Sequence, residues 1–524
     1  MEKISSNELR VIITFSGHSR RFKQAGYVLP KFLIKLDDEP IIKHVINMFA
    51  NEDFFDLIFN KDQIIQFPQI RKILEETLPK NNYRIIEIEP HEMGPAFSVN
   101  QLEDIDENEK VLISYCDFLV DWDYKQFCNS LEDCDGAIPA FQGFQPASFG
   151  STLYAYMRVN KDDHLLELRE KKNFTDTRHQ EPASVGLYYF KKWSYFKHSY
   201  NKSVNEKIFE GYKEHYVSLI YNELVKEGFI IKVPLVKKFI CLGTPEDLDQ
   251  YLNWYQYFKK KNGNSLELKN LINLIPMAGV GKRFKDHGYK ISKPLILIDS
   301  TPMVIKSCNS FPIPENWIFI LKKEDNIKFK IKEKINNNFK NAQIIPIENA
   351  TTGQAATCLY AKDLIKDDKS IYVASADYEL FFNQKKFLDE IMKNIKIDAV
   401  VFTKKLKGNL IKNPKAFGYC QIDDENRITK ITEKQTISTN PGYDPLVVGS
   451  FWFRSSKLFF SLLDQIIKKD IKINGEHYIA NGMNLLIKKN YNVVSFDVDE
   501  WISFGDPFEL ELYYFWSEYF NERK

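Results

Sequence analysis

The feature of this 524-residue chain that most restricts its fold is an internal repeat one full domain long. The segment TFSGHSRRFKQAGYVLPKFLI at 14–34 matches PMAGVGKRFKDHGYKISKPLI at 276–296 without gaps, at an offset of 262 residues. Near the end of each half, LGTPEDLDQY at 242–251 matches FGDPFELELY at 504–513 at the same offset. A period of this length excludes a solenoid of short repeats and predicts two sibling domains.

The boundary between the two halves is expected in the segment FKKKNGNSLELKN at 258–270. There a lysine run and Asn-Gly-Asn-Ser, typical of a loop, follow an aromatic stretch of helical character at 247–258. We therefore predict a first domain over 1–258, a linker over 259–269 and a second domain over 270–524.

Within each half, apolar runs alternate with stretches of helical spacing. The expected strands are VIITF at 11–15, KVLISY at 110–115, LINLI at 271–275, SIYVAS at 370–375, ASVGLYYF at 183–190 and VVGSFWFR at 447–454, and an expected helix is IIKHVINMF at 41–49. Strands alternating with helices predict an α/β fold in which helices cover both faces of a mainly parallel sheet. Ligands of such sheets bind beyond the carboxyl ends of the strands.

Composition excludes several classes of function. The chain has 72 Lys+Arg and 71 Asp+Glu, so it lacks the basic surplus of a general nucleic-acid binder. Its 7 cysteines show no CxxC pair, which favours free thiols over disulfides or a zinc site. The polar start MEKISSNELR and the short apolar runs predict neither a signal peptide nor a membrane span. We expect a cytoplasmic protein with no nucleic-acid partner and no membrane insertion.

A Gly-rich turn after the first strand of each half is a candidate phosphate site. In the second half the turn is Gly279-Val280-Gly281, and Arg283 and Lys293 follow it. Small residues let backbone N–H groups approach phosphate oxygens, and the cations suit a triphosphate. The corresponding residues of the first half are Gly17, Arg21 and Lys31. A tight turn with solvated basic residues is the alternative, but recurrence at the same spacing to GY and Lys favours phosphate binding.

The pattern PMAGVGKRF…GY…SKPLI resembles the signature of sugar-phosphate nucleotidyltransferases, the NDP-sugar pyrophosphorylases, and most closely their capsule and surface-polysaccharide branch. The resemblance implies two tandem domains of GT-A/Rossmann-like fold. It also implies a reaction in which an NTP and a sugar 1-phosphate give an NDP-sugar and pyrophosphate, with Mg²⁺. The chain lacks a Walker A pattern, and GVGKRF lacks the third glycine of a dinucleotide-binding fingerprint.

The resemblance places nucleotide-binding residues in a second segment of each half. This segment is TTGQAATCLYA at 351–361 and EMGPAFSVNQL at 92–102. Gly353 and Gly94 would let the base lie close to the backbone, and Gln354 would read the base edge. The first half has Pro95 at the position of Gln354. A plain helix N-terminus is the structural alternative.

An aspartate after a buried strand is the candidate metal ligand of each half: Asp117 and Asp377. In the family this carboxylate holds Mg²⁺ against the phosphates. Two polyanions must meet, and a hard cation held by few carboxylates screens their charges. An aspartate at a strand end can also be only a helix cap, but its recurrence favours metal binding.

By resemblance, a Glu-Lys pair and a later glycine contact the acceptor sugar phosphate. These residues are Glu170, Lys171 and Gly186 in the first half, and Glu433, Lys434 and Gly449 in the second. Glu-Lys pairs are common on protein surfaces, so only the position of this pair between the strands supports the assignment.

The chain departs from the family where many members place a second metal-binding aspartate. Cys241 and Ser503 occupy that position, and Asp497 or Asp499 is the candidate replacement in the second half. Asp506 also stands where the first half has Thr244, and its charge would repel a phosphate unless a metal intervenes. We expect the second half to be the more competent NTP site.

Three readings of the function stay open on the sequence. The first is the nucleotidyltransferase, with Arg283, Lys293, Arg21 and Lys31 as catalytic cations and an NTP and a phosphorylated sugar, or another small phosphate, as substrates. The second is a glycosyltransferase that uses an NDP-sugar. The third is a ligand-binding chain in which one half or both are not catalytic. Homo-oligomerisation is left open.

Overall fold

The computed structural model describes residues 9–259, 266–406 and 413–522. These residues form two compact units: one holds the described residues up to Gln256 and from Glu518 onward, and the other holds Tyr257–Ser517. Residues 260–265 of the predicted linker lie outside the described residues. The predicted domain boundaries therefore stay a prediction.

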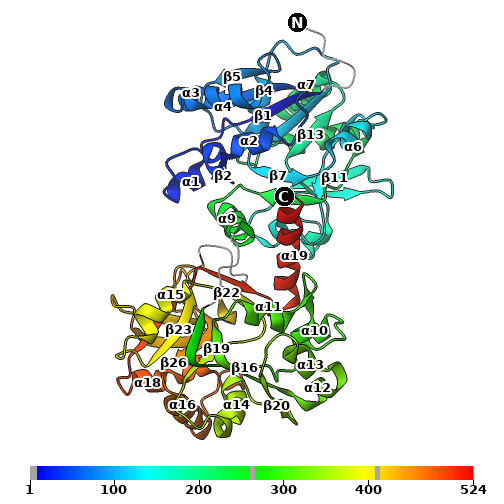
Figure 1. The fold of residues 1–524 in the computed structure, drawn as a ribbon. Helices are drawn as coiled ribbons and strands as arrows, with labels where there is room; N and C mark the ends of the chain where they lie inside the picture. Colours follow the sequence, from blue (N-terminus) through cyan, green and yellow to red (C-terminus); the bar gives the residue numbers. More distant parts are fainter. Residues whose placement is uncertain (1–8, 260–265, 407–412, 523–524) are drawn as a thin grey trace. The chain divides into compact units, whose positions relative to one another are not determined.

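The first unit is built on a sheet of seven strands (Figure 1). Their order across the sheet is β5 (Tyr83–Ile88), β4 (Phe54–Asn60), β1 (Arg10–Thr14), β6 (Val111–Tyr115), β13 (Leu187–Phe190), β8 (Gly136–Ala137) and β14 (Ile231–Lys232). Only β13 runs antiparallel to its neighbours.

The second unit repeats this strand order. Its strands are β20 (Gln343–Ile347), β19 (Ile313–Lys322), β16 (Glu267–Pro276), β21 (Ser370–Val373), β26 (Leu446–Phe453), β23 (Ala399–Lys404) and β27 (Val493–Asp497). β26 is the antiparallel strand and corresponds to β13. The domain-long repeat in the sequence is thus a repeat of topology, and the predicted α/β class with mainly parallel sheets is confirmed.

Alternating burial along the strands shows that helices cover both faces of the second sheet. Leu271 and Ile275 of β16 belong to one apolar cluster, whereas Ile272 and Leu274 belong to the other. Side chains of a strand alternate between faces, so the two clusters are the cores on opposite sides of one sheet. The first is packed with α11 (Met303–Asn309) and α13 (Ile331–Asn336), and the second with α14 (Gln354–Cys358) and α16 (Ser456–Lys468).

The strands and helices expected from the sequence are present, with shifted ends. The expected helices are α2 (Ile41–Ile46) and α9 (Pro245–Lys259). The expected strand at 183–190 is divided into β12 (Ala183–Ser184) and β13, and Gly186, which has a φ of 100°, lies between them. Its counterpart β26 continues through Gly449, which has a φ of 90°.

Smaller strand pairings lie beside the main sheets. β24 (Gly418–Ile422) pairs with β25 (Ile428–Glu433) and with β26, whereas β10 (Ala155–Val159) and β11 (Leu165–Glu170) belong to a separate four-stranded sheet of the first unit. Two further pairings join β7 (Phe118–Asp121) to β15 (Lys238–Cys241), and β22 (Tyr378–Phe381) to β28 (Glu500–Ser503). β7 and β22 begin directly after Asp117 and Asp377, so these two pairings bring Cys241 and Ser503 near those aspartates.

The aromatic core of the second unit gives a test of the fold. Phe402 is fully buried and its ring contacts those of Tyr372 and Phe387. Replacing Phe402 by Ala should lower the free energy of unfolding by about 3–5 kcal/mol, since a buried ring leaves a cavity. Tyr443→Ala, at a site that is 61% exposed, should change it by less than about 0.5 kcal/mol. Urea denaturation followed by circular dichroism measures both, and equal effects would contradict the packing described.

Candidate active site

The candidate phosphate loop follows β16 and leads into the short helix α10 (Lys282–Asp286). Gly281 has a φ of 66°, in the left-handed region that favours glycine. In the first unit Ser19 takes the same conformation, with a φ of 50°, before α1 (Arg20–Gln24). Its hydroxyl accepts a hydrogen bond from the Lys31 N–H at 3.1 Å. The Gly-to-Ser difference between the halves therefore leaves the path of the loop unchanged.

Part of the repeated signature has a packing role. Phe22 and Tyr27 meet edge to face at 5.3 Å, and Phe284 and Tyr289 do so at 5.1 Å. In both units the tyrosine N–H also donates to the phenylalanine carbonyl. These contacts close the segment between the turn and the signature lysine, so the lysine returns to the end of the first strand.

The signature lysine of each half forms an ion pair with the aspartate after the buried strand. Lys31 Nζ lies 2.7 Å from Asp117 Oδ2, and Lys293 Nζ lies 2.6 Å from Asp377 Oδ2. Burial alone would lower the pKa of Lys31, but Asp117 beside it raises the pKa above its ordinary value. Lys293 also donates to the Gly505 carbonyl at 2.8 Å. The structure thus brings the predicted cation and the predicted metal ligand together in both halves.

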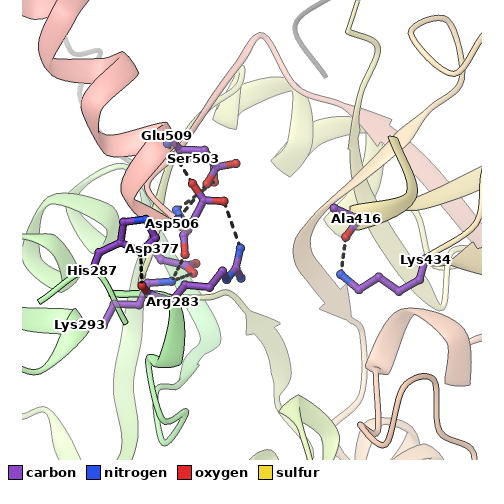
Figure 2. A network of polar contacts seen from close by, with 10 residues as sticks. Arg283, His287, Lys293, Asp377, Ala416, Lys434, Ser503, Asp506 and Glu509 are labelled. Atoms are coloured by element: carbon purple, nitrogen blue, oxygen red, sulfur yellow. Dashed lines mark hydrogen bonds and ion pairs between the residues drawn. The ribbon is translucent and has the colours of Figure 1, made fainter. Parts of the chain in front are cut away.

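Arg283 joins this group through Asp506 (Figure 2). Its guanidinium lies 3.3 Å from Asp506 Oδ2, and the carboxylate of Asp506 caps α19 (Pro507–Asn521) by accepting from Glu509 N–H at 3.0 Å. Asp506, which could repel a phosphate, is thus partly balanced by the arginine. Thr244 takes the place of Asp506 in the first half.

A half-buried carboxylate that the sequence analysis missed lies beside the metal-ligand candidate in each half. Ser503 Oγ donates to Glu509 Oε2 at 2.7 Å, and Cys241 Sγ donates to Asp247 Oδ2 at 3.3 Å. Burial raises the pKa of Glu509 and of Asp247. The offset of 262 residues between the two acids was the signal that could have found them.

Two carboxylates of the second half lie on the same side of Gly505. A Cβ added to this glycine would lie 2.9 Å from Glu509 Oε2 and 3.9 Å from Asp377 Oδ2, the oxygen that is paired with Lys293. Within the described ranges, no three His, Cys, Asp or Glu side chains form a metal-holding group. Mg²⁺ needs only one or two carboxylates when phosphates and waters complete its shell, so the donor set fits it. Asp497, a predicted replacement ligand, is the last residue of β27. Burial raises the pKa of its carboxyl, and the nearby Lys404 opposes that rise.

The predicted base-binding glycines lie against another loop of their own unit. Gly94 and Gly353 precede α5 (Pro95–Asn100) and α14, with φ of 93° and 120°. A Cβ on Gly353 would meet His477 N at 2.7 Å, and one on Gly94 would meet His215 N at 2.8 Å. These glycines are thus required by a close approach of backbone, and Gln354 is partly exposed at the start of α14.

The Glu-Lys pairs end the second strand of each hairpin. Lys171 and Lys434 both have left-handed backbone, with φ of 56° and 58°, which is uncommon for a residue with a side chain. Glu170 accepts a hydrogen bond from Ser218 Oγ at 2.6 Å, and burial raises its pKa. Burial likewise raises the pKa of Glu433 to about 7; Lys434 opposes the rise and Glu476 adds to it. Uncommon backbone next to a residue with a shifted pKa is a feature of functional sites.

The later glycines differ in their packing. A Cβ added to Gly186 would come within 2.9 Å of the Phe118 ring, whereas one added to Gly449 would lie 3.6 Å from the Tyr378 ring, an ordinary contact distance. The strand partner of Glu433 is Gly418, whereas that of Glu170 is Ala155.

The close approach at Gly353 gives a stability test. Gly353→Ala should lower the free energy of unfolding by about 2–4 kcal/mol, because its Cβ would overlap the backbone of His477 and its φ is unfavourable. Gly475→Ala is the matched control, since Gly475 also has a positive φ but no atom within 4 Å of its added Cβ. We expect that control to lose only about 1 kcal/mol. Thermal unfolding compares the two, and similar losses would contradict the contact.

The raised pKa of Glu433 gives a pH test. The folded carboxyl titrates at about 7 and the ordinary value is 4.5, so the unfolded chain loses this proton first as the pH rises. The free energy of unfolding therefore falls as the pH rises from 4.5 to about 7, and Glu433→Gln removes this pH-dependent loss. The variant should match the wild type at pH 4.5 and exceed it by about 2 kcal/mol at pH 8. Glu425→Gln at a largely exposed site is the control; a pH-independent difference for Glu433→Gln would contradict this account.

Comparison with known families agrees with this geometry. Residues 272–517 match the family described as nucleotidyl transferase, and residues 11–179 match the family described as MobA-like NTP transferase domain. The chain therefore carries two nucleotidyltransferase domains, one in each half. Across the described residues, no helix is both long and apolar enough to cross a membrane.

Curated relatives match one half of the chain. The bifunctional protein GlmU of Methanocaldococcus jannaschii is 28% identical over 220 residues, which cover 41% of this chain and 47% of the relative. The GlmU of Methanococcus aeolicus is 27% identical over 241 residues, covering 45% and 52%. The chain thus spans about half the length of these relatives.

Solved structures similar to this chain include two enzymes that each cover about half of it. The nucleoside-diphosphate-sugar pyrophosphorylase of Vibrio cholerae is 22% identical, with a TM-score of 0.38, and covers 47% of this chain and 99% of its own. The inositol-1-phosphate CTP transferase of T. maritima is 16% identical, with a TM-score of 0.38, and covers 49% and 97%.

Proposed function

We propose that this protein is a nucleotidyltransferase that couples an NTP to a sugar 1-phosphate, or a similar small phosphate, and releases pyrophosphate. The observation that carries the proposal is the Lys293–Asp377 ion pair beside the phosphate loop, repeated as Lys31–Asp117. The family matches of both halves support the same class of reaction. So does the name of a Sulfurisphaera tokodaii relative, a bifunctional sugar-1-phosphate nucleotidylyltransferase/acetyltransferase that is 24% identical over 237 residues.

In the proposed mechanism, the loop residues Gly279, Val280 and Gly281 and the side chains of Arg283 and Lys293 bind the triphosphate. Asp377, with Glu509 next to it, would hold Mg²⁺, which supplies charge neutralisation between the two phosphates. The acceptor phosphate is already anionic, so the chain need not provide a general base. Its oxygen attacks the α-phosphorus in line, and Arg283 and Lys293 stabilise the charge that grows on the departing pyrophosphate.

Substrate contacts follow from the same arrangement. Gly353 and Gln354 would contact the base, and Glu433, Lys434 and Gly449 would hold the acceptor phosphate and its sugar. Their first-half counterparts are Gly94, Glu170, Lys171 and Gly186, with Gly17 and Arg21 in the phosphate loop. A role in capsule or surface-polysaccharide synthesis in the cytoplasm, with no nucleic-acid partner, completes the proposal and rests on the sequence resemblance.

The second half is proposed as the principal catalytic half. It combines Gly281 in the loop, Gln354 at the base segment and a glutamate, Glu509, beside Asp377. The first half differs by His18 in its loop, whose ring contacts the His91 carbonyl, and by a Ser16–Ser98–His91 chain of hydrogen bonds. It is proposed to bind a nucleotide of its own.

Pyrophosphate release tests the function and assigns the working half. The protein is incubated with each NTP, Mg²⁺ and a panel of phosphorylated acceptors that includes glucose 1-phosphate and N-acetylglucosamine 1-phosphate. Asp377→Ala should lower turnover about 100-fold or more, because it removes the metal ligand, whereas Asp117→Ala should retain most activity. Arg283→Ala should lower kcat by about 100-fold.

Two outcomes would contradict the proposal. Consumption of an NDP-sugar without NTP use would indicate a glycosyltransferase. Nucleotide binding with no pyrophosphate from any pair of substrates would indicate a non-catalytic protein. Asp464→Ala, on the exposed pair with Lys362, is the control for loss of an acidic residue elsewhere in the second unit.

A further inference from the structure

The tripeptide Glu-His-Tyr occurs in both halves, at 214–216 and 476–478, again 262 residues apart. In the first unit it precedes η4 (Val217–Ile220), and in the second it precedes α17 (Ile479–Gly482). We name these two segments the EHY loops. Their recurrence at the domain offset invites a comparison of what each loop contacts.

In each EHY loop, the backbone of the histidine makes two hydrogen bonds, one to each side of the glycine in the proposed base-binding segment. His477 N–H donates to the Thr352 carbonyl at 2.6 Å, and the Ala355 N–H donates to the His477 carbonyl at 3.1 Å. In the first unit the same two hydrogen bonds join His215 to Met93 and Ala96, at 2.7 and 2.9 Å. This two-bond bracket fixes the segment on which the nucleotide base is proposed to lie.

In each unit, the lysine of the Glu-Lys pair makes a cation–π contact with the tyrosine ring of the EHY loop. The Lys434 ammonium lies 5.6 Å from the centre of the Tyr478 ring, and the Lys171 ammonium lies 4.9 Å from that of Tyr216. A cation over an aromatic face is attracted by the ring electrons. Lys434 also donates to the Ala416 carbonyl, as Figure 2 shows. The ring and the carbonyl together direct a lysine whose backbone is left-handed.

The phosphate-loop arginines lie near the same tyrosines. Burial raises the pKa of Tyr478 and of Tyr216, and Arg283 and Arg21 oppose that rise. In each unit, one tyrosine ring is therefore within electrostatic range of two cations: the arginine of the phosphate loop and the lysine of the Glu-Lys pair.

The histidine rings argue against a purely structural motif. His215 Nδ1 contacts the Tyr200 hydroxyl, whereas His477 contacts Thr352 through Nδ1 and Asp470 through Nε2. The packing of the rings is thus different in the two units, but the backbone bracket and the lysine–tyrosine contact are the same. The elements that recur are those that touch the two substrate sites.

We propose that the EHY loop is a positioning element that supports both proposed substrate sites of each domain, with Tyr478 and Tyr216 holding Lys434 and Lys171 for the acceptor's phosphate. This inference rests on the proposed function. It assigns to the tyrosine a role in binding phosphomonoesters that acts through the lysine, without contact between the tyrosine and the reacting atoms.

Steady-state kinetics with the NTP and acceptor that give pyrophosphate test the inference. Tyr478→Leu removes the aromatic face and should raise the KM for the acceptor about fivefold, with the KM for the NTP changed less than twofold. Tyr478→Phe keeps the ring and should restore both values to within twofold of wild type. Tyr491→Leu, at a site 40% exposed in the same unit, is the control. Should Tyr478→Leu fail to fold, Tyr478→Met replaces it.

A double-mutant cycle separates positioning from a general structural effect. Because Tyr478 acts through Lys434, Tyr478→Leu should change the acceptor KM less than twofold when Lys434 is already Ala. Independent effects of the two substitutions would overturn the inference, as would an unchanged acceptor KM in Tyr478→Leu or equal rises in both KM values. A wild-type protein that releases no pyrophosphate would instead overturn the proposed function, on which this inference rests.

Discussion

The ion pair between the signature lysine and the strand-end aspartate is the interaction on which the site depends. It joins the segment that follows the first strand of each unit to the end of the neighbouring strand, β6 or β21. The lysine Nζ and the aspartate Oδ2 are 2.7 Å apart in the first unit and 2.6 Å apart in the second. Opposite charges at this distance stabilise each other most when partly shielded from water, as both are here. In the proposed mechanism, a cation bound to the aspartate would release the lysine to a phosphate, and the pair would then link folding to ligand binding.

The two halves share the main backbone features of this site and differ in several of its side chains. Both halves retain the left-handed residue before the first helix, the lysine–aspartate pair and the glycine held by the EHY loop. They differ in the carboxylate beside the metal-ligand candidate, Asp247 or Glu509, and in the residue opposite the arginine. Side-chain differences around these shared features are what two domains with different ligands or rates would show.

The sequence predicted the fold and most of the candidate site because its signals are local. Apolar runs mark the strands, and the phosphate loop and Asp377 follow β16 and β21, which are parallel neighbours and so end at the same edge of the sheet. Glu509 was missed although the offset of 262 residues marks it, and the EHY loops were missed because their significance arises from contacts between distant segments, such as the 2.6 Å bond from His477 N–H to the Thr352 carbonyl. The break at Gly186 was also missed, because the ring of Phe118, which leaves no room for a Cβ there, comes from another segment of the chain.

Nucleotide binding by lysine variants tests the central claim most directly. Lys293→Met and Lys31→Met keep the length of the side chain and remove its charge, and isothermal titration with the Mg²⁺-NTP that supports turnover measures affinity and stoichiometry. The account predicts two sites per wild-type chain, with each variant weakening one of them at least about tenfold through loss of a phosphate contact. Equal affinity and stoichiometry in the wild type and both variants would contradict it.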